Sequence, residues 1–249
     1  AKQLKQRGIA YASSTTTSAS HASYYPGSFP LTTKLTFDPK TGQLYGAQCI
    51  GHDGADKRID QLALIVKRKG TIADLIALEQ AYAPPFSSAK DPIAIAGYVA
   101  GNIINGSMPV IYWRELRDTD RKTITIIDTR TKEEYALDAI DGAINIPLDD
   151  LRERIEEIPH DKPIVLYCAV GLRGYLAQRI LLGHGFTDVR NLSGGYKLYA
   201  SATRTSWSTS TTEDQPKAKA APATMLRLDA CGLSCPGPII KLKETIDSM

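Results

Sequence analysis

The stretch that decides the fold is PIVLYCAVGLRGYLAQRILL, residues 163–182. Its first five residues are apolar and include β-branched side chains, as in a short buried strand, and residues 172–184 have the apolar spacing of a helix. Cys168 therefore lies in a loop between a strand end and a helix start. Unpaired backbone N–H groups and the helix dipole favour the thiolate there. Because the thiolate is the nucleophilic form of cysteine, the stretch predicts sulfur chemistry at Cys168.

Strands and helices alternate on both sides of this stretch. The sequence predicts strands over 123–127, 142–147, 164–167 and 189–192, and helices over 131–137, 148–158 and 172–184. A chain that alternates in this way forms a parallel sheet covered by helices on both faces. We therefore predict an α/β unit over residues 107–201.

Residues 1–106 are predicted to form a separate α+β unit. Strands at 31–37 and 43–50 flank a turn and form a hairpin, and helices follow at 56–69, 72–79 and 91–105. Thr71 with Asp74 three residues later is an N-terminal capping signature, and Pro92 opens the last helix. Strands followed by helices indicate an α+β fold.

The end of the chain has a different composition. Residues 202–224 are rich in Ser, Thr, Ala, Pro and Lys and are predicted to be a flexible linker. Residues 225–249 begin like a strand and continue as an amphipathic helix, but so few residues cannot bury a core alone. We therefore expect a truncated domain there, in a chain that is part of a longer protein.

Composition excludes several classes of protein. The chain has 249 residues with 43% hydrophobic and 23% charged residues, which is ordinary for a globular protein. A net charge of +3 with scattered basic residues argues against nucleic-acid binding. The sequence has no apolar run of the roughly 20 residues that a membrane helix needs. Four cysteines in a chain of this length predict free thiols and a cytoplasmic location.

Residues 107–201 resemble a rhodanese domain. The resemblance rests on motifs along the whole section, namely Asp128-Thr129-Arg130, Glu134-Tyr135, residues 142–147, the loop 168–174 and Gly194-Gly195. It implies that Cys168 accepts a sulfane sulfur, holds it as a persulfide and passes it to a nucleophile, while Arg173 orients an anionic donor. The terminal sulfur would lie among the loop amides of Ala169, Val170, Gly171, Leu172 and Gly174.

Two alternatives stay open for this loop. A phosphatase loop has five residues between Cys and Arg, usually with His before the Cys. Here four residues separate Cys168 from Arg173, and Tyr167 precedes the cysteine, so the loop fits a sulfur atom better than a phosphate. The other alternative is a buried, unreactive cysteine at a strand end.

Residues 1–106 resemble the dimerisation domain of flavin-dependent pyridine nucleotide-disulfide reductases, nearest to coenzyme A disulfide reductases and persulfide reductases. The matching segments are 21–27, 46–48, 56–60 and 82–92. The resemblance implies a homodimer in which Tyr24 and Tyr82 reach the partner subunit's redox cysteine, with Tyr25 competing for the role of Tyr24. FAD, NAD(P)H and coenzyme A are implied for the parent enzyme. This chain has no Gly-x-Gly-x-x-Gly fingerprint to bind a dinucleotide itself, and Cys49 is predicted to be a small core residue.

Residues 225–249 resemble the start of a TusA/SirA-like sulfur-carrier domain. The resemblance rests on Cys235-Pro236-Gly237-Pro238, with Cys235 at a helix N-terminus that favours its thiolate. Cys231 and Cys235 would make only half of a zinc site, so no metal is expected. A flexible linker would bring Cys235 to Cys168 at high effective concentration.

Together, these features predict a sulfur-transferring C-terminal region of an FAD- and NAD(P)H-dependent coenzyme A disulfide or persulfide reductase. The expected partners are small thiols and persulfides, such as coenzyme A, glutathione and thiosulfate, and a sulfur-relay protein. The alternative from another class is a non-catalytic scaffold that dimerises or stores sulfur.

Overall fold

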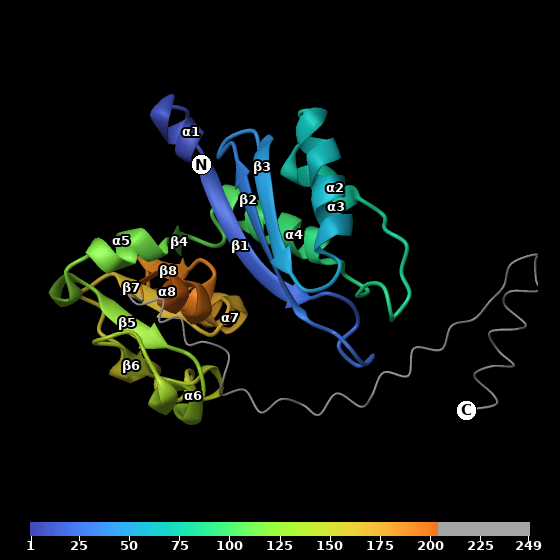
Figure 1. The fold of residues 1–249 in the computed structure, drawn as a ribbon. Helices are drawn as coiled ribbons and strands as arrows, with labels where there is room; N and C mark the ends of the chain where they lie inside the picture. Colours follow the sequence, from blue (N-terminus) through green and yellow to red (C-terminus); the bar gives the residue numbers. More distant parts are fainter. Residues whose placement is uncertain (204–249) are drawn as a thin grey trace, which may run out of the picture. The chain divides into compact units, whose positions relative to one another are not determined.

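The computed structural model describes residues 1–203, which build two separate sheets with their helices (Figure 1). The predicted linker began two residues too early, because residues 202 and 203 still belong to a helix that ends at Thr203. The rest of the linker and the sulfur-carrier segment, with Cys231 and Cys235, lie outside the described residues. No helix of residues 1–203 is long and apolar enough to cross a membrane.

The first sheet has three antiparallel strands in the order β1-β2-β3: β1 (Ala12–Ala19), β2 (Pro30–Phe37) and β3 (Leu44–Gly51). The predicted hairpin is β2 with β3 and is confirmed. β1, an edge strand made of Ala, Ser and Thr, was not predicted, nor was the short helix α1 (Lys2–Gln6).

Three helices cover one face of this sheet: α2 (Ala55–Lys67), α3 (Ile72–Ala77) and α4 (Pro92–Ile104) (Figure 1). The Thr71–Asp74 capping box forms as predicted, and Asp91 accepts a hydrogen bond from the Ile93 amide at the start of α4. The core between helices and sheet contains Leu35, Phe37, Leu44, Leu62, Ile72, Leu75, Ile93, Ala96 and Ala100.

A buried ion pair joins two of these helices. Arg58 on α2 is 1% exposed, and its guanidinium lies 2.7 Å from the Asp91 carboxylate. Asp91 also accepts hydrogen bonds from Ser87 Oγ at 2.8 Å and from the Ile93 amide. Burial opposes ionisation of Asp91, but these hydrogen bonds outweigh it and lower the pKa of the carboxyl.

The second sheet has five parallel strands in the order β4-β8-β7-β5-β6. They are β4 (Val110–Ile111), β5 (Thr125–Asp128), β6 (Ile144–Asn145), β7 (Ile164–Tyr167) and β8 (Val189–Leu192). The predicted parallel sheet is confirmed, and β4 is an additional edge strand that the sequence analysis missed.

Helices lie on both faces of the parallel sheet: α5 (Trp113–Asp118), α6 (Lys132–Leu137), α7 (Leu172–Gly183) and α8 (Gly195–Thr203). One core contains Ile127, Leu166 and residues of α7, and the other contains Ile126, Val165 and residues of α5. Neighbouring strand residues thus face opposite cores. The sequence analysis missed α5 and α8.

The predicted helix over 148–158 is wrong. This segment forms two 3₁₀ turns, Leu148–Asp150 and Ile155–Glu157, joined by irregular turns. Its apolar residues still reach the core, so the periodicity was real. Glu156 and Glu157 would place negative charge at the negative end of an α-helix, which disfavours a continuous helix there.

Tyr112 connects the second unit to the edge of the first sheet. Its hydroxyl accepts a hydrogen bond from the Ser13 amide at 3.1 Å and donates one to the Ser13 carbonyl at 2.9 Å. Ser13 lies on β1, whose outer backbone groups have no neighbouring strand in this sheet. One side chain therefore satisfies a donor and an acceptor of an edge strand.

Candidate active site

Cys168 is the first residue of the loop after β7 and is buried beneath it. The cysteine is 1% exposed, and the Gly171 amide donates a hydrogen bond to Sγ at 3.1 Å. Gly171 has a φ of +117°, a left-handed conformation that suits glycine and turns the chain into α7. The local sequence therefore aims a backbone N–H at the sulfur where the helix begins, as the strand–loop–helix pattern predicted.

Two backbone hydrogen bonds join helix α8 to this loop. The Tyr196 amide donates to the Cys168 carbonyl at 2.8 Å, and the Lys197 amide donates to the Ala169 carbonyl at 3.0 Å. In a trans peptide the N–H points opposite to the C=O, so the amides of Ala169 and Val170 point away from α8. Gly195 permits this approach, because a Cβ there would lie 2.5 Å from the Cys168 carbonyl oxygen.

Asn191 on β8 holds the other end of the loop. Its Nδ2 donates to the Gly171 carbonyl at 3.0 Å, and the side chain is buried. Gly174 packs against the same side chain, since a Cβ there would lie 2.4 Å from Asn191 Oδ1. The sequence analysis missed Asn191, although a polar residue inside a buried strand is a usable signal.

Arg173 lies at the mouth of the loop and binds Glu134. Its two terminal nitrogens donate to the two Glu134 oxygens at 2.6 and 2.8 Å, and each side chain is about one-third exposed. Arg173 lowers the pKa of Glu134 to about 2, against a smaller opposing effect of burial. Glu134, and to a lesser extent Cys168, raise the pKa of Arg173. The predicted donor-orienting arginine is therefore already engaged by a carboxylate.

The Asp128-Thr129-Arg130 motif supports the loop, and its side chains bind neighbouring backbone and carboxylate groups and not the sulfur. Arg130 donates to both Asp128 carboxylate oxygens and to the Asp138 carbonyl at 2.7 Å. Its guanidinium carbon lies 4.3 Å from the ring centre of Tyr196 on α8. The amide and the hydroxyl of Thr129 both donate to the carbonyl of Tyr167, which precedes the cysteine. The motif thus ties β5 to the end of β7.

Tyr24 and Tyr82 come together, although 58 residues separate them. Their hydroxyls lie 2.8 Å apart, and the side chains are 75% and 50% exposed. The hydrogen bond with Tyr24 raises the pKa of Tyr82. Tyr25, the competing residue, lies edge-on against His21 instead. Cys49 is half-buried with Sγ 3.4 Å from Thr33 Oγ1, so the prediction of a core position for it was wrong.

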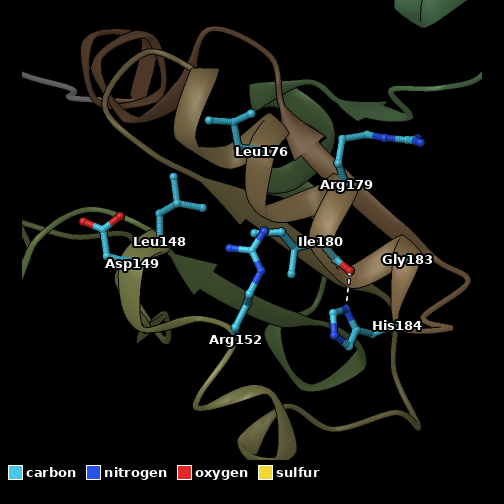
Figure 2. A pocket seen from close by; sticks show the side chains of 8 residues that line it. All are labelled: Leu148, Asp149, Arg152, Leu176, Arg179, Ile180, Gly183 and His184. Carbon is cyan, nitrogen blue, oxygen red and sulfur yellow. Dashed lines mark hydrogen bonds between the residues drawn. The ribbon is translucent and has the colours of Figure 1, made fainter.

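A hollow of about 570 Å³ lies along α7 but does not include Cys168 (Figure 2). Its lining consists of Leu148, Asp149, Arg152, Leu176, Arg179, Ile180, Gly183 and His184. Arg179 binds the Ser107 carbonyl, and His184 Nδ1 lies 2.8 Å from the Ile180 carbonyl oxygen. The lining offers no thiol or hydroxyl nucleophile, so we place the chemistry at the Cys168 loop despite the size of the hollow. Residues 1–203 contain no cluster of three or more His, Cys, Asp or Glu side chains that could hold a metal.

Two family models match the chain. Residues 112–202 match the rhodanese-like domain, and residues 1–92 match the dimerisation domain of pyridine nucleotide-disulphide oxidoreductases. Both domains were expected from the sequence motifs.

Coenzyme A disulfide reductases and a persulfide reductase are among the proteins similar to this chain. The chain is 45% identical to reduced Bacillus anthracis CoADR-RHD, with a TM-score of 0.78 over 80% of this chain and 36% of that one. It is 37% identical to an NAD-dependent persulfide reductase from A. fulgidus, with a TM-score of 0.71 over 80% of this chain and 35% of that one. It is 43% identical to the coenzyme A disulfide reductase of Staphylococcus aureus (strain JH9) over 84 residues, 34% of this chain. The chain spans only 19% of that relative's length.

Proposed function

We propose that this chain is the sulfur-transferring region of a coenzyme A disulfide or persulfide reductase, and that Cys168 carries sulfane sulfur as a persulfide. The observation that carries this proposal is the Gly171 amide 3.1 Å from the buried Cys168 Sγ. The bonds from α8 to the Cys168 and Ala169 carbonyls support it, because they keep the loop amides free for an anion. The rhodanese-like match and the two named classes of relatives agree with it.

The proposed reaction has two steps at one sulfur. The Cys168 thiolate attacks the outer sulfur of a donor such as thiosulfate; the donor S–S bond breaks, and sulfite leaves with the electron pair. The enzyme then holds Cys–S–S⁻, whose terminal charge is stabilised by amides of the loop. An acceptor thiolate attacks that terminal sulfur, the new S–S bond forms on the acceptor, and the Cys168 thiolate is restored. No net oxidation or reduction occurs.

A phosphatase is less well supported. Phosphate recognition uses the two-pronged guanidinium of an arginine. Here Arg173 presents that face to Glu134, whose negative charge would also repel a phosphate dianion. Four residues between Cys168 and Arg173 also make the loop short for a phosphate.

Residues 1–106 are proposed to mediate homodimerisation, with the exposed Tyr24–Tyr82 pair serving the partner subunit's active site. FAD, NAD(P)H and coenzyme A are proposed for the parent enzyme. Within residues 1–203, the loop after β7 holds the cysteine instead of a dinucleotide fingerprint, and the first sheet is antiparallel. The proposed sulfur transfer therefore uses no dinucleotide step. Relay of sulfur through Cys235 is proposed on its sequence motif alone.

Intact mass spectrometry of the full chain tests the proposal. After incubation with thiosulfate or glutathione persulfide, the wild type should gain the mass of one sulfur atom and lose it on addition of a thiol. Cys168→Ala should not show this gain of one sulfur mass, whereas Cys49→Ala should behave like wild type. Cys235→Ala separates any sulfur carried on the second predicted cysteine. A folded wild type that takes up no sulfur, or uptake that is indifferent to Cys168→Ala, would favour the scaffold alternative.

A further inference from the structure

We propose that Glu134 determines donor specificity at the Cys168 loop. By pairing with Arg173 it removes a free positive charge from the loop mouth, which disfavours dianionic donors such as thiosulfate and favours persulfides of small thiols. This inference rests on the proposed sulfur transfer and names the donor class that the site prefers.

The Cys168 loop contains a single charged residue. Between Cys168 and Gly174 only Arg173 carries a charge. Both of its terminal nitrogens bind Glu134 at 2.6 and 2.8 Å, so the guanidinium offers its bidentate face to a protein carboxylate. Arg130, the other arginine near the loop, is buried and bound to Asp128. Neither guanidinium is therefore free to neutralise an incoming dianion.

Glu134 is fixed before any donor arrives. The Glu134 amide donates to Thr131 Oγ1 at 3.3 Å, and the Thr131 amide donates to Glu134 Oε2 at 3.0 Å. This capping box begins α6 and holds the carboxylate that meets Arg173. Because the pKa of Glu134 is about 2, the carboxylate stays charged throughout the neutral range.

The Arg173–Glu134 pair adds no net charge at the entrance to the loop. Glu134 and Arg173 together are neutral, and both are about one-third exposed, where a donor can approach them. A free Arg173 would attract the reacting group of thiosulfate, with two negative charges, about twice as strongly as the persulfide group of a small thiol, which carries one. It would also stabilise sulfite as that group leaves. The ion pair therefore acts against thiosulfate more than against a persulfide.

The test compares Glu134→Gln with Glu133→Gln in the full chain. Glutamine at this helix position preserves a capping box but cannot neutralise the arginine. Glu133→Gln removes the same charge one residue away in the first turn of α6, from a side chain that does not pair with Arg173. The measurement is the rate of sulfur uptake on Cys168 from thiosulfate and from glutathione persulfide, each at low and high salt.

Glu134→Gln should raise the ratio of thiosulfate rate to persulfide rate about tenfold, equivalent to about 1.4 kcal/mol. Its thiosulfate rate should also fall as salt increases, because an unpaired cation is screened. Glu133→Gln should leave the ratio within about twofold of wild type. In the double variant Glu134→Gln/Arg173→Gln the gain should disappear, since Glu134 acts through the arginine.

Thr131→Ala controls for damage to α6, because it removes the cap hydroxyl and leaves the ion pair. If Thr131→Ala shifts the ratio as Glu134→Gln does, the effect is structural and the proposal is overturned. An unchanged ratio in a folded Glu134→Gln protein that still takes up sulfur overturns the role of Glu134 alone. If wild type takes up sulfur from neither donor, both this inference and the proposed function are overturned.

Discussion

Gly195→Ala should push the Cys168 loop away from helix α8. Gly195 has a φ of +62°, and an alanine Cβ would lie 2.5 Å from the Cys168 carbonyl oxygen and 2.8 Å from the Val170 nitrogen. Both are backbone atoms, so no side chain can rotate away. Ordinary contact begins near 3.4 Å, and α8 and the loop must therefore separate by about 0.9 Å.

The cost has two parts. A left-handed conformation costs alanine about 1–2 kcal/mol. The separation also stretches the Tyr196-to-Cys168 and Lys197-to-Ala169 hydrogen bonds, now 2.8 and 3.0 Å, each worth about 0.5–1.5 kcal/mol. We expect the free energy of unfolding to fall by about 2–5 kcal/mol. A displacement near 1 Å at a reacting group can lower a rate by about 100-fold, so sulfur uptake on Cys168 should slow by 10-fold or more, on the order of that limit.

Gly142→Ala is the matched control. Gly142 belongs to the same unit and has a φ of +76°, but a Cβ there would meet nothing within 4 Å. It should lose only the conformational cost of about 1–2 kcal/mol and keep the rate of sulfur uptake. Urea unfolding and intact mass against time measure both effects. If Gly195→Ala matches Gly142→Ala in stability and in uptake, the backbone contact between α8 and the loop does not position the cysteine.

Three further predictions concern ion pairs and an edge strand. Arg58→Leu should lower the free energy of urea unfolding by about 3–5 kcal/mol, because the buried Asp91 carboxylate loses its cation. Adding Asp91→Asn should recover part of that stability, and a loss below about 1 kcal/mol in Arg58→Leu would contradict the prediction. The stability contributed by Glu134 is the unfolding free energy of wild type minus that of Glu134→Gln. It should be constant above pH 4.5 and decline as the pH falls toward about 2, because folding lowers the pKa of the carboxyl. A difference that grows on acidification would show the opposite linkage. Tyr112→Phe removes both hydrogen bonds to Ser13, so hydrogen exchange at the Ser13 amide should become about tenfold faster. An unchanged exchange rate would mean that the Tyr112 hydroxyl does not protect the edge of β1.

The parallel sheet could be predicted because its strands are buried on both faces. Residues 125–128 and 164–167 are buried throughout, and residues 125–127 and 164–167 each form a short continuous apolar or β-branched run in the sequence. β1 gave no such signal. Its Ala, Ser and Thr residues are mostly half-buried, and they are held by pairing with β2 along eight positions. A strand fixed by a neighbour's backbone leaves little trace in its own side chains.

The positions of the loop's partners could not be predicted for a different reason. Cys168, Gly171 and Arg173 are local in sequence, and the strand–loop–helix pattern placed them correctly. Asn191, which binds the Gly171 carbonyl, lies 20 residues away on the neighbouring strand. Its position beside the loop follows from the strand order β8-β7, which local periodicity does not determine.

Glu134 shows how a local motif can conceal a second role. Thr131 and Glu134 form an N-terminal capping box, and that pattern alone accounts for the glutamate in the sequence. Yet the oxygen that accepts the Thr131 amide also binds Arg173, 39 residues away. The same carboxylate thus begins a helix and sets the charge at the loop mouth. Sequence spacing could place an arginine beside the cysteine, but whether that arginine is free to bind an anion depends on which carboxylate the fold brings to it.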